Sequence, residues 1–405
     1  MAGLTRYQYE LRLYDEKLLT FEFAGDPPGG AKVLSVECGR RELFPLDFVI
    51  EDGELPHEGL GRWLRKRTIP KNRAYVHNIL NSLGLSVRDT KGIIDICKGL
   101  SLNDSYWVVP AGFDGKFDDY NLFENRFSEA LALTALTGES LSADKARRIR
   151  TSPEFTTDGM LPKAWRHDSG KIMLFKGGVW RQYAQTPDPL EPFSEFYAAQ
   201  IAGVMGLNPV KYGLSRWKGI LGSTCELFTD IDTAYVPAAT AARSYYKAES
   251  SPDYYLACEK WYKDFDCKNG TNLYDYFAST LVFDSLILNE DRHLGNFGVL
   301  RDNHSGKIIG NAPVFDNGMN LFNYSSIQEL RKIDPHRRAY ANYFKDSFDA
   351  QAKHFGSNLQ IEQLAKLADF KFRRHSRYNW EPERLEIISE YIRNRASELI
   401  GMMTG

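Results

Sequence analysis

Residues 288–300 read LNEDRHLGNFGVL, and residues 313–320 read PVFDNGMN. In the first stretch Asp291 is followed five residues later by Asn296, and in the second Asp316 comes after a short apolar step. Phosphoryl transfer from a nucleotide uses a carboxylate to orient the attacking hydroxyl, with an amide oxygen and a second carboxylate to hold Mg²⁺ beside the phosphates. Mg²⁺ prefers such hard oxygen ligands. The two stretches therefore predict a phosphotransfer site in which Asp291 and Asn296 are catalytic and Asn296 and Asp316 bind the metal.

The flanking sequence predicts a loop between structured elements. Residues 273–288 (LYDYFASTLVFDSLIL) carry apolar side chains on most sides and predict a buried helix. Residues 297–300 and 308–309 predict a hairpin that turns at 303–306. Each polar residue taken alone would also suit an ordinary turn. The ordered pair of polar stretches with a hairpin between them favours the catalytic interpretation.

The pattern Asp-Arg-His-x-x-Asn at 291–296, followed by Phe-Asp-Asn-Gly at 315–318, resembles the catalytic and metal-binding segments of HipA-like serine/threonine kinases. Its first half also resembles phosphatidylinositol kinases, and neither His-Arg-Asp nor Asp-Phe-Gly of ordinary protein kinases is present. The resemblance implies an α+β, two-lobed protein-kinase-like fold with a small β-rich N-terminal region and a mostly helical C-lobe. It implies transfer of the ATP γ-phosphoryl group to Ser or Thr with Mg²⁺. Arg292 and His293 are expected to brace the loop.

The same resemblance assigns residues 151–163 to the loop that covers the phosphates, with Gly159 and Lys163 nearest to them. The stretch holds a single glycine, so it is neither a Walker A loop nor a Gly-x-Gly-x-x-Gly motif, and alone it would be an ordinary turn. Because the family phosphorylates itself in this loop, its hydroxyls are candidate acceptors: Thr151, Ser152, Thr156 and Thr157.

Lys176 ends an apolar strand (171–176) shortly after this loop. Lysines in strands usually face solvent, but a kinase needs a positive charge at this point for the α- and β-phosphates. Glu195 shares its helix face with alanines that would let the helix approach the sheet, so we expect it to pair with Lys176. Glu191 is the alternative partner, although an acid at a helix start also suits the helix dipole.

Residues 210–214 and 220–228 predict two further strands. The resemblance places the kinase hinge at the end of the second strand, where the main chain of Glu226 and Phe228 would bind the adenine edge. Without the resemblance, an ordinary core strand explains this stretch almost as well.

Composition is that of a globular protein, with 43% hydrophobic and 26% charged residues among 405. A net charge of −2 disfavours direct binding of nucleic acid by the chain as a whole. The five cysteines are scattered and contain no Cys-x-x-Cys pair, which argues against a disulfide framework and a zinc site. The first 25 residues are rich in charge and no long apolar run occurs, so we expect a cytoplasmic protein without direct membrane contact.

We expect three regions: a β-rich and helical N-terminal region (1–100), a kinase N-lobe with an accessory helix (101–230, the nucleotide lobe from about 151) and a helical C-lobe (231–405). Strands are predicted at 7–24, 33–36 and 43–50, and helices at 74–83, 90–98, 121–137 and 382–400.

A basic group surrounds Trp63, consisting of Arg62, Arg65, Lys66, Arg67, Lys71 and Arg73. It would suit a helix-turn-helix that grips DNA, but a solvated basic face is the favoured interpretation.

The main prediction is an active Mg-ATP-dependent serine/threonine kinase that phosphorylates a protein substrate. Members of the family often act as growth-regulating toxins restrained by a small DNA-binding antitoxin, so such a partner is expected as well. The alternatives are a catalytically silent nucleotide-binding regulator, a DNA-associated transcriptional regulator and, with less support, a lipid kinase. The presence of all five key polar residues argues against a silent protein: Lys176, Glu195, Asp291, Asn296 and Asp316.

Overall fold

The chain forms two compact units in the computed structural model. The structure describes residues 7–24, 30–48, 57–146, 149–179, 189–243, 245, 254–332, 340–341 and 346–405. The first unit comprises Met1–Lys176, Thr229–Val236 and Leu300–Ile309, and the second comprises Gly177–Phe228, Pro237–Val299 and Gly310–Gly405. The three regions expected from the sequence stay a prediction.

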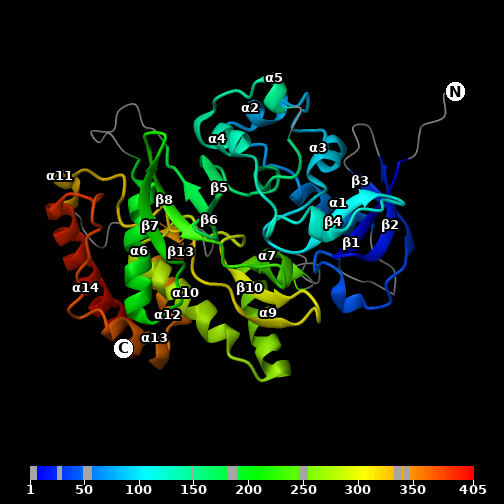
Figure 1. The fold of residues 1–405 in the computed structure, drawn as a ribbon. Coiled ribbons are helices and arrows are strands. Elements are labelled where there is room, and N and C mark those ends of the chain that lie inside the picture. The colour runs from blue at the N-terminus through cyan, green and yellow to red at the C-terminus, as the bar shows by residue number, and fades with distance from the viewer. Residues whose placement is uncertain are drawn as a thin grey trace. The chain divides into compact units, whose positions relative to one another are not determined.

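The first unit begins with a four-stranded antiparallel sheet of order β3-β2-β1-β4, drawn in blue and cyan in Figure 1. Its strands are β1 (Gln8–Leu13), β2 (Glu16–Ala24), β3 (Gly30–Val36) and β4 (Tyr106–Pro110). Alternate residues Tyr9, Leu11 and Leu13 are buried, and Trp63 of helix α1 (His57–Lys66) belongs to the same core. The strands predicted within 7–24 and at 33–36 are confirmed.

The strand predicted at 43–50 is wrong in its described part. Residues Arg41–Leu43 form a 3-10 helix (η1), and the N–H of Phe48 donates to the carbonyl oxygen of Pro45 to close a turn. Pro45 has no N–H for a strand ladder, which favours the turn. Residues 49 and 50 lie outside the described residues.

A second core in this unit is built from short helices: α2 (Val76–Asn81), α3 (Thr90–Cys97), α4 (Glu129–Thr137) and the 3-10 helix η3 (Pro153–Phe155). The unit also contains α5 (Ala143–Ala146) and the 3-10 helix η2 (Phe117–Asp119). The predictions at 74–83 and 90–98 are confirmed. The helix predicted from residue 121 begins at Glu129 instead. The side chain of Asn121 accepts the N–H groups of Phe123 and Glu124 and turns the chain, and Ser128 then caps α4 by accepting the N–H of Leu131.

The basic group around Trp63 is not a single solvated face. Arg67 is buried and paired with Asp104, and its guanidinium lies 4.2 Å from the centroid of the Trp63 ring. Arg73 is buried as well and donates to backbone carbonyl oxygens of residues 154, 157 and 163. These two arginines are therefore structural, and only part of the group remains on the surface.

One hairpin lies wholly in the first unit, and one small sheet lies partly in it. β5 (Lys163–Asp168) pairs with β6 (Lys171–Lys176). A three-stranded sheet of order β11-β10-β9 is formed by β9 (Thr233–Pro237), β10 (Gly298–Asp302) and β11 (Ile308–Asn311). The hairpin predicted between 297 and 309 is thus confirmed, and the hydrogen bond from Gly306 N to Asp302 O closes its turn.

The second unit starts with helix α6 (Glu191–Met205), which packs on the hairpin of β7 (Tyr212–Trp217) and β8 (Ile220–Glu226). Its other elements are α7 (Ala238–Ala241), α9 (Tyr254–Asn269), α10 (Leu273–Ile287), α11 (Ile327–Leu330), β12 (Tyr340–Ala341), β13 (Asp346–Ser347), α12 (Phe348–Phe355), α13 (Asn358–Ala365) and α14 (Pro382–Thr404). The last helix confirms the prediction for 382–400.

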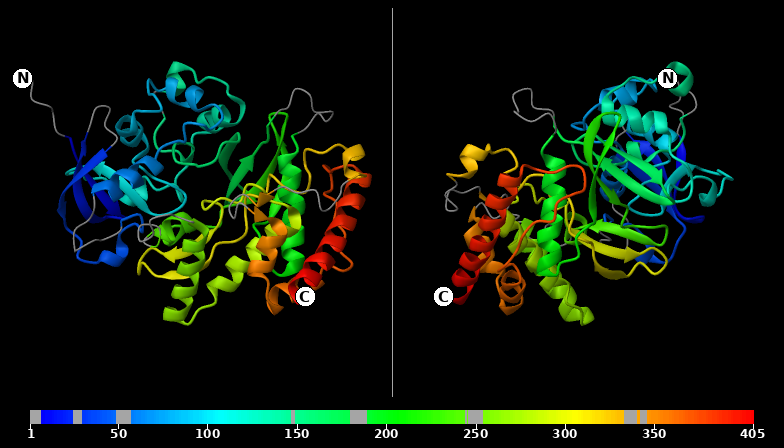
Figure 2. Two further views of the ribbon diagram at one scale, coloured as in Figure 1. Left: turned by 180° about the vertical axis from the view of Figure 1, so that it is seen from behind. Right: turned by 60° about the vertical axis from the view of Figure 1, so that its left-hand side comes forward.

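Helix α10 is the centre of this unit. It contacts α9, α12, α13 and α14, and the neighbouring helices can be followed around it in Figure 2. Most of its side chains are buried, as the apolar residues on all its faces predicted. The loop that follows it is therefore fixed to a rigid support.

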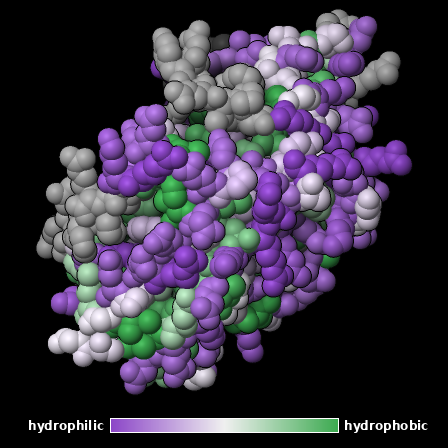
Figure 3. Space-filling view, turned by 90° about the vertical axis from the view of Figure 1, so that its left-hand side faces the viewer, coloured by the Kyte–Doolittle hydropathy of each residue, from purple (hydrophilic) through white to green (hydrophobic). Residues whose placement is uncertain are grey.

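The face in Figure 3 is mostly hydrophilic, with hydrophobic residues in small separate groups. Within the described residues, none of the helices has the length and apolar character needed to cross a membrane.

We expect Ser128→Ala to lower the free energy of unfolding by about 1 kcal/mol, because the N–H of Leu131 loses its cap. Ser128→Asp is the control, since aspartate caps equally well. Urea titration and hydrogen exchange of α4 measure the effect. Equal losses in the two variants would contradict the capping role.

Candidate active site

Helix α10 ends by turning the chain sharply into the loop of residues 289–296. Leu288 adopts a left-handed conformation (φ 54°), and its N–H donates to the carbonyl oxygen of Asp284. Asn289 continues the turn, because its N–H reaches the same carbonyl oxygen and its side-chain Nδ2 donates to the Asp284 carboxylate at 3.0 Å. The end of α10 thus sets the direction in which the loop begins.

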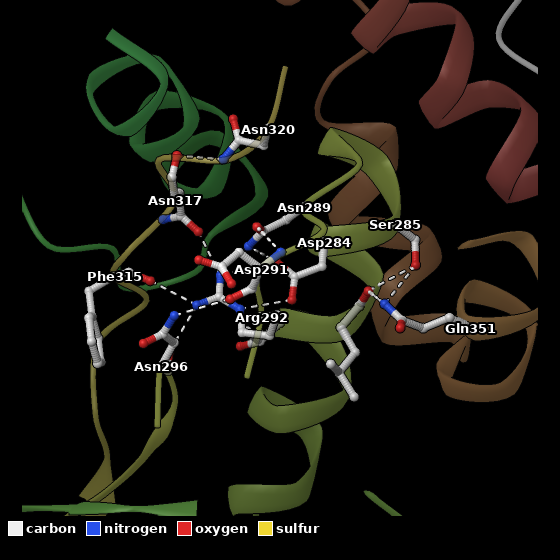
Figure 4. Close-up of polar contacts among 12 residues, drawn as sticks. Asp284, Ser285, Asn289, Asp291, Arg292, Asn296, Phe315, Asn317, Asn320 and Gln351 are labelled. Atoms are coloured by element: carbon white, nitrogen blue, oxygen red, sulfur yellow. Dashed lines mark hydrogen bonds and ion pairs between the residues drawn. The ribbon is translucent and has the colours of Figure 1, made fainter. Parts of the chain in front are cut away.

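The guanidinium of Arg292 lies at the centre of the site (Figure 4). Its Nε and Nη2 donate to the two carboxylate oxygens of Asp284 at 2.9 and 3.0 Å. Its Nη1 donates to the carbonyl oxygens of Asn296 (2.9 Å) and Phe315 (2.8 Å). Its Nη2 also donates to Oδ1 of Asn317 at 2.6 Å. One side chain therefore joins helix α10, the loop and the segment around Asp316, which confirms that Arg292 braces the loop.

This ion pair is almost completely buried, with side-chain exposures of 3% for Arg292 and 1% for Asp284. Burial alone would lower the pKa of Arg292, but the adjacent Asp284 carboxylate more than offsets it, so the pKa of Arg292 is raised and the side chain stays charged. Removing one partner of such a pair strands a charge in the interior.

The loop also orients its two predicted catalytic residues. The N–H of Asp291 donates to Oδ1 of Asn289 at 3.2 Å. Nδ2 of Asn296 donates back to the carbonyl oxygen of Asp291 at 3.1 Å. Because the amide nitrogen of Asn296 is used within the loop, its oxygen is the atom suited to bind a cation. His293 braces the loop as predicted, since its Nδ1 accepts the N–H of Gly295.

Asp316 lies in a turn with left-handed backbone (φ 57°). Its N–H donates to the Tyr212 hydroxyl at 3.1 Å, while its neighbours Phe315 and Asn317 both accept hydrogen bonds from Arg292. The carboxylate-bearing residue is therefore held on both sides. The structure brings the Asp316 segment to the loop that carries Asp291 and Asn296.

Glu195 and Glu191 lie on α6 in the same unit, both buried. Glu195 accepts a hydrogen bond from the hydroxyl of Ser223 on β8, so α6 does approach the sheet along its alanine face. Glu191 has another role in the structure: its Oε1 accepts from the N–H of Val179 (3.3 Å) and from the Tyr324 hydroxyl (2.6 Å). A Cβ on Gly318 would lie 3.5 Å from Cβ of Glu191 and 3.8 Å from Oε1 of Glu195, so both acids are near the Asp-Asn-Gly turn.

The predicted hinge lies at the end of β8. Glu226 is the last residue of this strand, and the Phe228 ring lies 5.3 Å, centroid to centroid, from the ring of Phe315. The aromatic contact connects the hinge segment to the residue that precedes Asp316. Adenine binding by Glu226 and Phe228 stays a prediction.

Gly159, Lys163 and Lys176 belong to the first unit. Gly159 has φ +88°, and a side chain there would collide with the ammonium group of Lys163, whose Nζ donates to the carbonyl oxygen of Asp158 at 2.7 Å. Lys163 and Lys176 lie directly opposite one another in the β5–β6 pair, and both are buried. Opposite residues of an antiparallel pair share a face, so the two lysine side chains leave the strands on the same side. The pairing of Lys176 with Glu195 stays a prediction.

The four candidate acceptor hydroxyls of residues 151–157 are all hydrogen-bonded. Ser152 and Thr156 are buried and donate to the Glu154 carboxylate and to a backbone carbonyl oxygen. Thr151 and Thr157 are half-buried and donate to backbone carbonyl oxygens as well. Phosphorylation of Ser152 or Thr156 would require this segment to open.

The donor atoms fit Mg²⁺ better than a softer metal. An amide oxygen on Asn296 and a carboxylate on Asp316 are hard ligands, and a nucleotide would add phosphate oxygens. Within the part of the chain that the structure describes, no three His, Cys, Asp or Glu side chains are grouped as a metal site.

Sequence reasoning missed Asp284, Asn289 and Tyr212. Asp284 carried a signal, since an acid in an otherwise apolar helix needs a buried partner and Arg292 follows eight residues later. Tyr212 carried none, because its contact with Asp316 spans 104 positions.

Comparison with known proteins supports the fold. No protein-family model matches the sequence, and no curated protein matches it. A chain from the Shewanella oneidensis MR-1 structure of the HipA–HipB toxin–antitoxin system with operator DNA matches with a TM-score of 0.57 and 14% identity, over 98% of this chain and 99% of that one. The Helicobacter pylori proinflammatory kinase CtkA matches with a TM-score of 0.47 and 17% identity, over 60% of this chain and 93% of that one.

The likeness to the toxin–antitoxin structure shows that this chain has a HipA-like fold. The predicted fold class, α+β and kinase-like, is confirmed.

Arg292→Met should destabilise the second unit by about 3–5 kcal/mol, because Asp284 becomes a buried carboxylate without its partner. Urea titration followed by circular dichroism, with hydrogen exchange of α10, measures the loss. Arg393→Met is the control. Within the described residues, the hydrogen bond resolved for the Arg393 side chain goes to the carbonyl oxygen of Phe370.

The double variant Asp284→Leu/Arg292→Met removes both charges and should recover part of the loss. A double variant as unstable as the sum of the two single variants would contradict an ion pair as the main interaction.

Proposed function

We propose that this protein is an Mg-ATP-dependent serine/threonine protein kinase of the HipA-like type. The observation that carries the proposal is the Arg292 network, which joins the loop bearing Asp291 and Asn296 to the segment bearing Asp316. A kinase requires one carboxylate for the acceptor hydroxyl and two oxygen ligands for the metal. The HipA-like fold supports the same assignment.

In the proposed reaction, the oxygen of a Ser or Thr hydroxyl attacks the γ-phosphorus of ATP, and ADP leaves. Asp291 orients this hydroxyl and accepts its proton. Asn296 and Asp316 would hold Mg²⁺, which neutralises charge on the phosphates when bound. The turn at Asp316 is fixed before substrate arrives, so the carboxylate needs little reorganisation.

The remaining site residues would bind ATP. Lys176 would hold the α- and β-phosphates, with Glu195 as its ion-pair partner. Gly159 and Lys163 would cover the phosphates, and the main chain at Glu226 and Phe228 would bind adenine. Lys163 and Lys176 are opposite one another in the β5–β6 pair, so both would be available on one face of the strands to a polyphosphate.

We further propose that the protein regulates growth as the toxin of a toxin–antitoxin pair, restrained by a small DNA-binding antitoxin. The support is its likeness in fold to a chain of the HipA–HipB system with operator DNA.

Wild-type protein incubated with Mg²⁺, labelled ATP and a degenerate Ser/Thr peptide mixture should incorporate label. Asp291→Asn should reduce the rate by about 10²–10⁴-fold, because the hydroxyl loses its proton acceptor. Asp316→Asn should also lose activity, because Mg²⁺ would lose one of its two proposed protein ligands. Scintillation counting and intact mass of the protein measure peptide labelling and autophosphorylation.

Asp369→Asn, an exposed carboxylate in the same unit, is the control and should keep full activity. Absence of both nucleotide binding and labelling in the wild type would refute the proposal. Binding of Mg-ATP without labelling would favour a silent nucleotide-binding regulator.

Lys176→Met and Glu195→Gln should each weaken binding of a non-hydrolysable ATP analogue. The double variant should bind the analogue no more weakly than the weaker of the two single variants. The reason is that the two residues would act as one ion pair, with a coupling of about 1–3 kcal/mol. Calorimetric titration measures the affinities. Glu191→Gln is the control, because glutamine keeps an acceptor for Val179 and Tyr324. Additive losses would show that Lys176 and Glu195 act separately.

A further inference from the structure

The segment after α6 pairs with the segment before Asp316 in a short parallel ladder. The N–H of Val314 donates to the carbonyl oxygen of Asn208, and the N–H of Val210 donates to the carbonyl oxygen of Val314, both at 2.9 Å. Pro209 faces Val314 in this bridge. A proline fits here because the ladder uses only groups of its two neighbours.

The ladder cannot continue in its regular form. In a parallel ladder, the next bond would run from the N–H of Asp316 to the carbonyl oxygen of Val210. Asp316 instead turns into the left-handed region (φ 57°), and its N–H donates to the side-chain hydroxyl of Tyr212 at 3.1 Å. The phenol oxygen thus takes the place of the Val210 carbonyl oxygen as acceptor, at the point where the chain leaves the ladder.

Tyr212 is well placed for this role. It is the first residue of β7, where it lies opposite Cys225 of β8, so its backbone is fixed by the hairpin. A tyrosine hydroxyl can both accept and donate a hydrogen bond, so its oxygen is able to accept the N–H of Asp316.

We propose that Tyr212 is a positioning residue, whose hydroxyl holds the backbone of Asp316 in its left-handed turn and thereby aims the metal-binding carboxylate. Arg292 holds Phe315 and Asn317 on either side of Asp316, and Tyr212 holds Asp316 itself. This inference rests on the proposed function, since it assigns the device that prepares Asp316 for Mg²⁺.

The test is Tyr212→Phe, which keeps the ring and removes the hydroxyl. Tyr197→Phe is the matched control, because it removes another tyrosine hydroxyl of the same unit, one that donates to Oδ1 of Asn379 at 2.9 Å. Asp316→Asn is the reference for loss of the metal ligand.

Two readouts are measured on the full chain. The first is hydrogen exchange of the peptide covering residues 314–318, without metal or nucleotide. The second is Mn²⁺ binding in the presence of a non-hydrolysable ATP analogue, followed by electron paramagnetic resonance.

We expect Tyr212→Phe to speed exchange of the 314–318 peptide and to weaken Mn²⁺ binding about ten-fold, the lower end of the effect of losing a partner that orients a metal ligand. Tyr197→Phe should change neither value.

If Asp316→Asn weakens Mn²⁺ binding while Tyr212→Phe behaves as Tyr197→Phe, the role of Tyr212 is refuted and the kinase site stands. If Asp316→Asn itself leaves Mn²⁺ binding unchanged, the metal site of the proposed function fails, and the role of Tyr212 in it fails too.

Discussion

The buried ion pair between Arg292 and Asp284 connects the parts of the second unit that carry the proposed chemistry. A guanidinium offers five N–H groups in a planar fork, and here they reach both oxygens of Asp284, two backbone carbonyl oxygens and the amide oxygen of Asn317. A lysine has no fork and could not hold these acceptors in fixed directions. The loop after α10 and the turn at Asp316 therefore keep one arrangement.

Such a pair contributes little net stability, because the cost of removing two charges from water nearly cancels their attraction. Its effect is on geometry instead. Asn317 illustrates the cost of that geometry: its oxygen faces Arg292, while its buried Nδ2 has no hydrogen-bond partner among the residues that the structure describes. A buried donor without an acceptor costs about 1–3 kcal/mol. Unsatisfied buried polar groups of this kind are expected mainly at functional sites.

Local patterns predicted much of the fold and which segments meet at the candidate site. The apolar residues on all faces of 273–288 predicted the buried helix, and the spacing of Asp291, Asn296 and Asp316 predicted three residues whose segments the structure joins. Failures arose where one side chain redirected the backbone. Asn121 turned a predicted helix into a loop by accepting two N–H groups. The contact of Tyr212 with Asp316 depends on a parallel ladder between distant segments, and no local pattern encodes it.

The turn at Asp316 combines a local backbone preference with contacts from residues distant in the sequence. Left-handed backbone is natural for glycine and costs energy for other residues, although aspartate tolerates it better than most. Gly318 lies two residues later, but the proposed metal-binding role requires a carboxylate at 316 itself. The fold therefore holds Asp316 in this conformation through hydrogen bonds from outside: Arg292 fixes the residues before and after it, and Tyr212 accepts its N–H. Strain held by surrounding contacts persists without ligand, so in the proposed kinase the carboxylate would be oriented before a nucleotide binds.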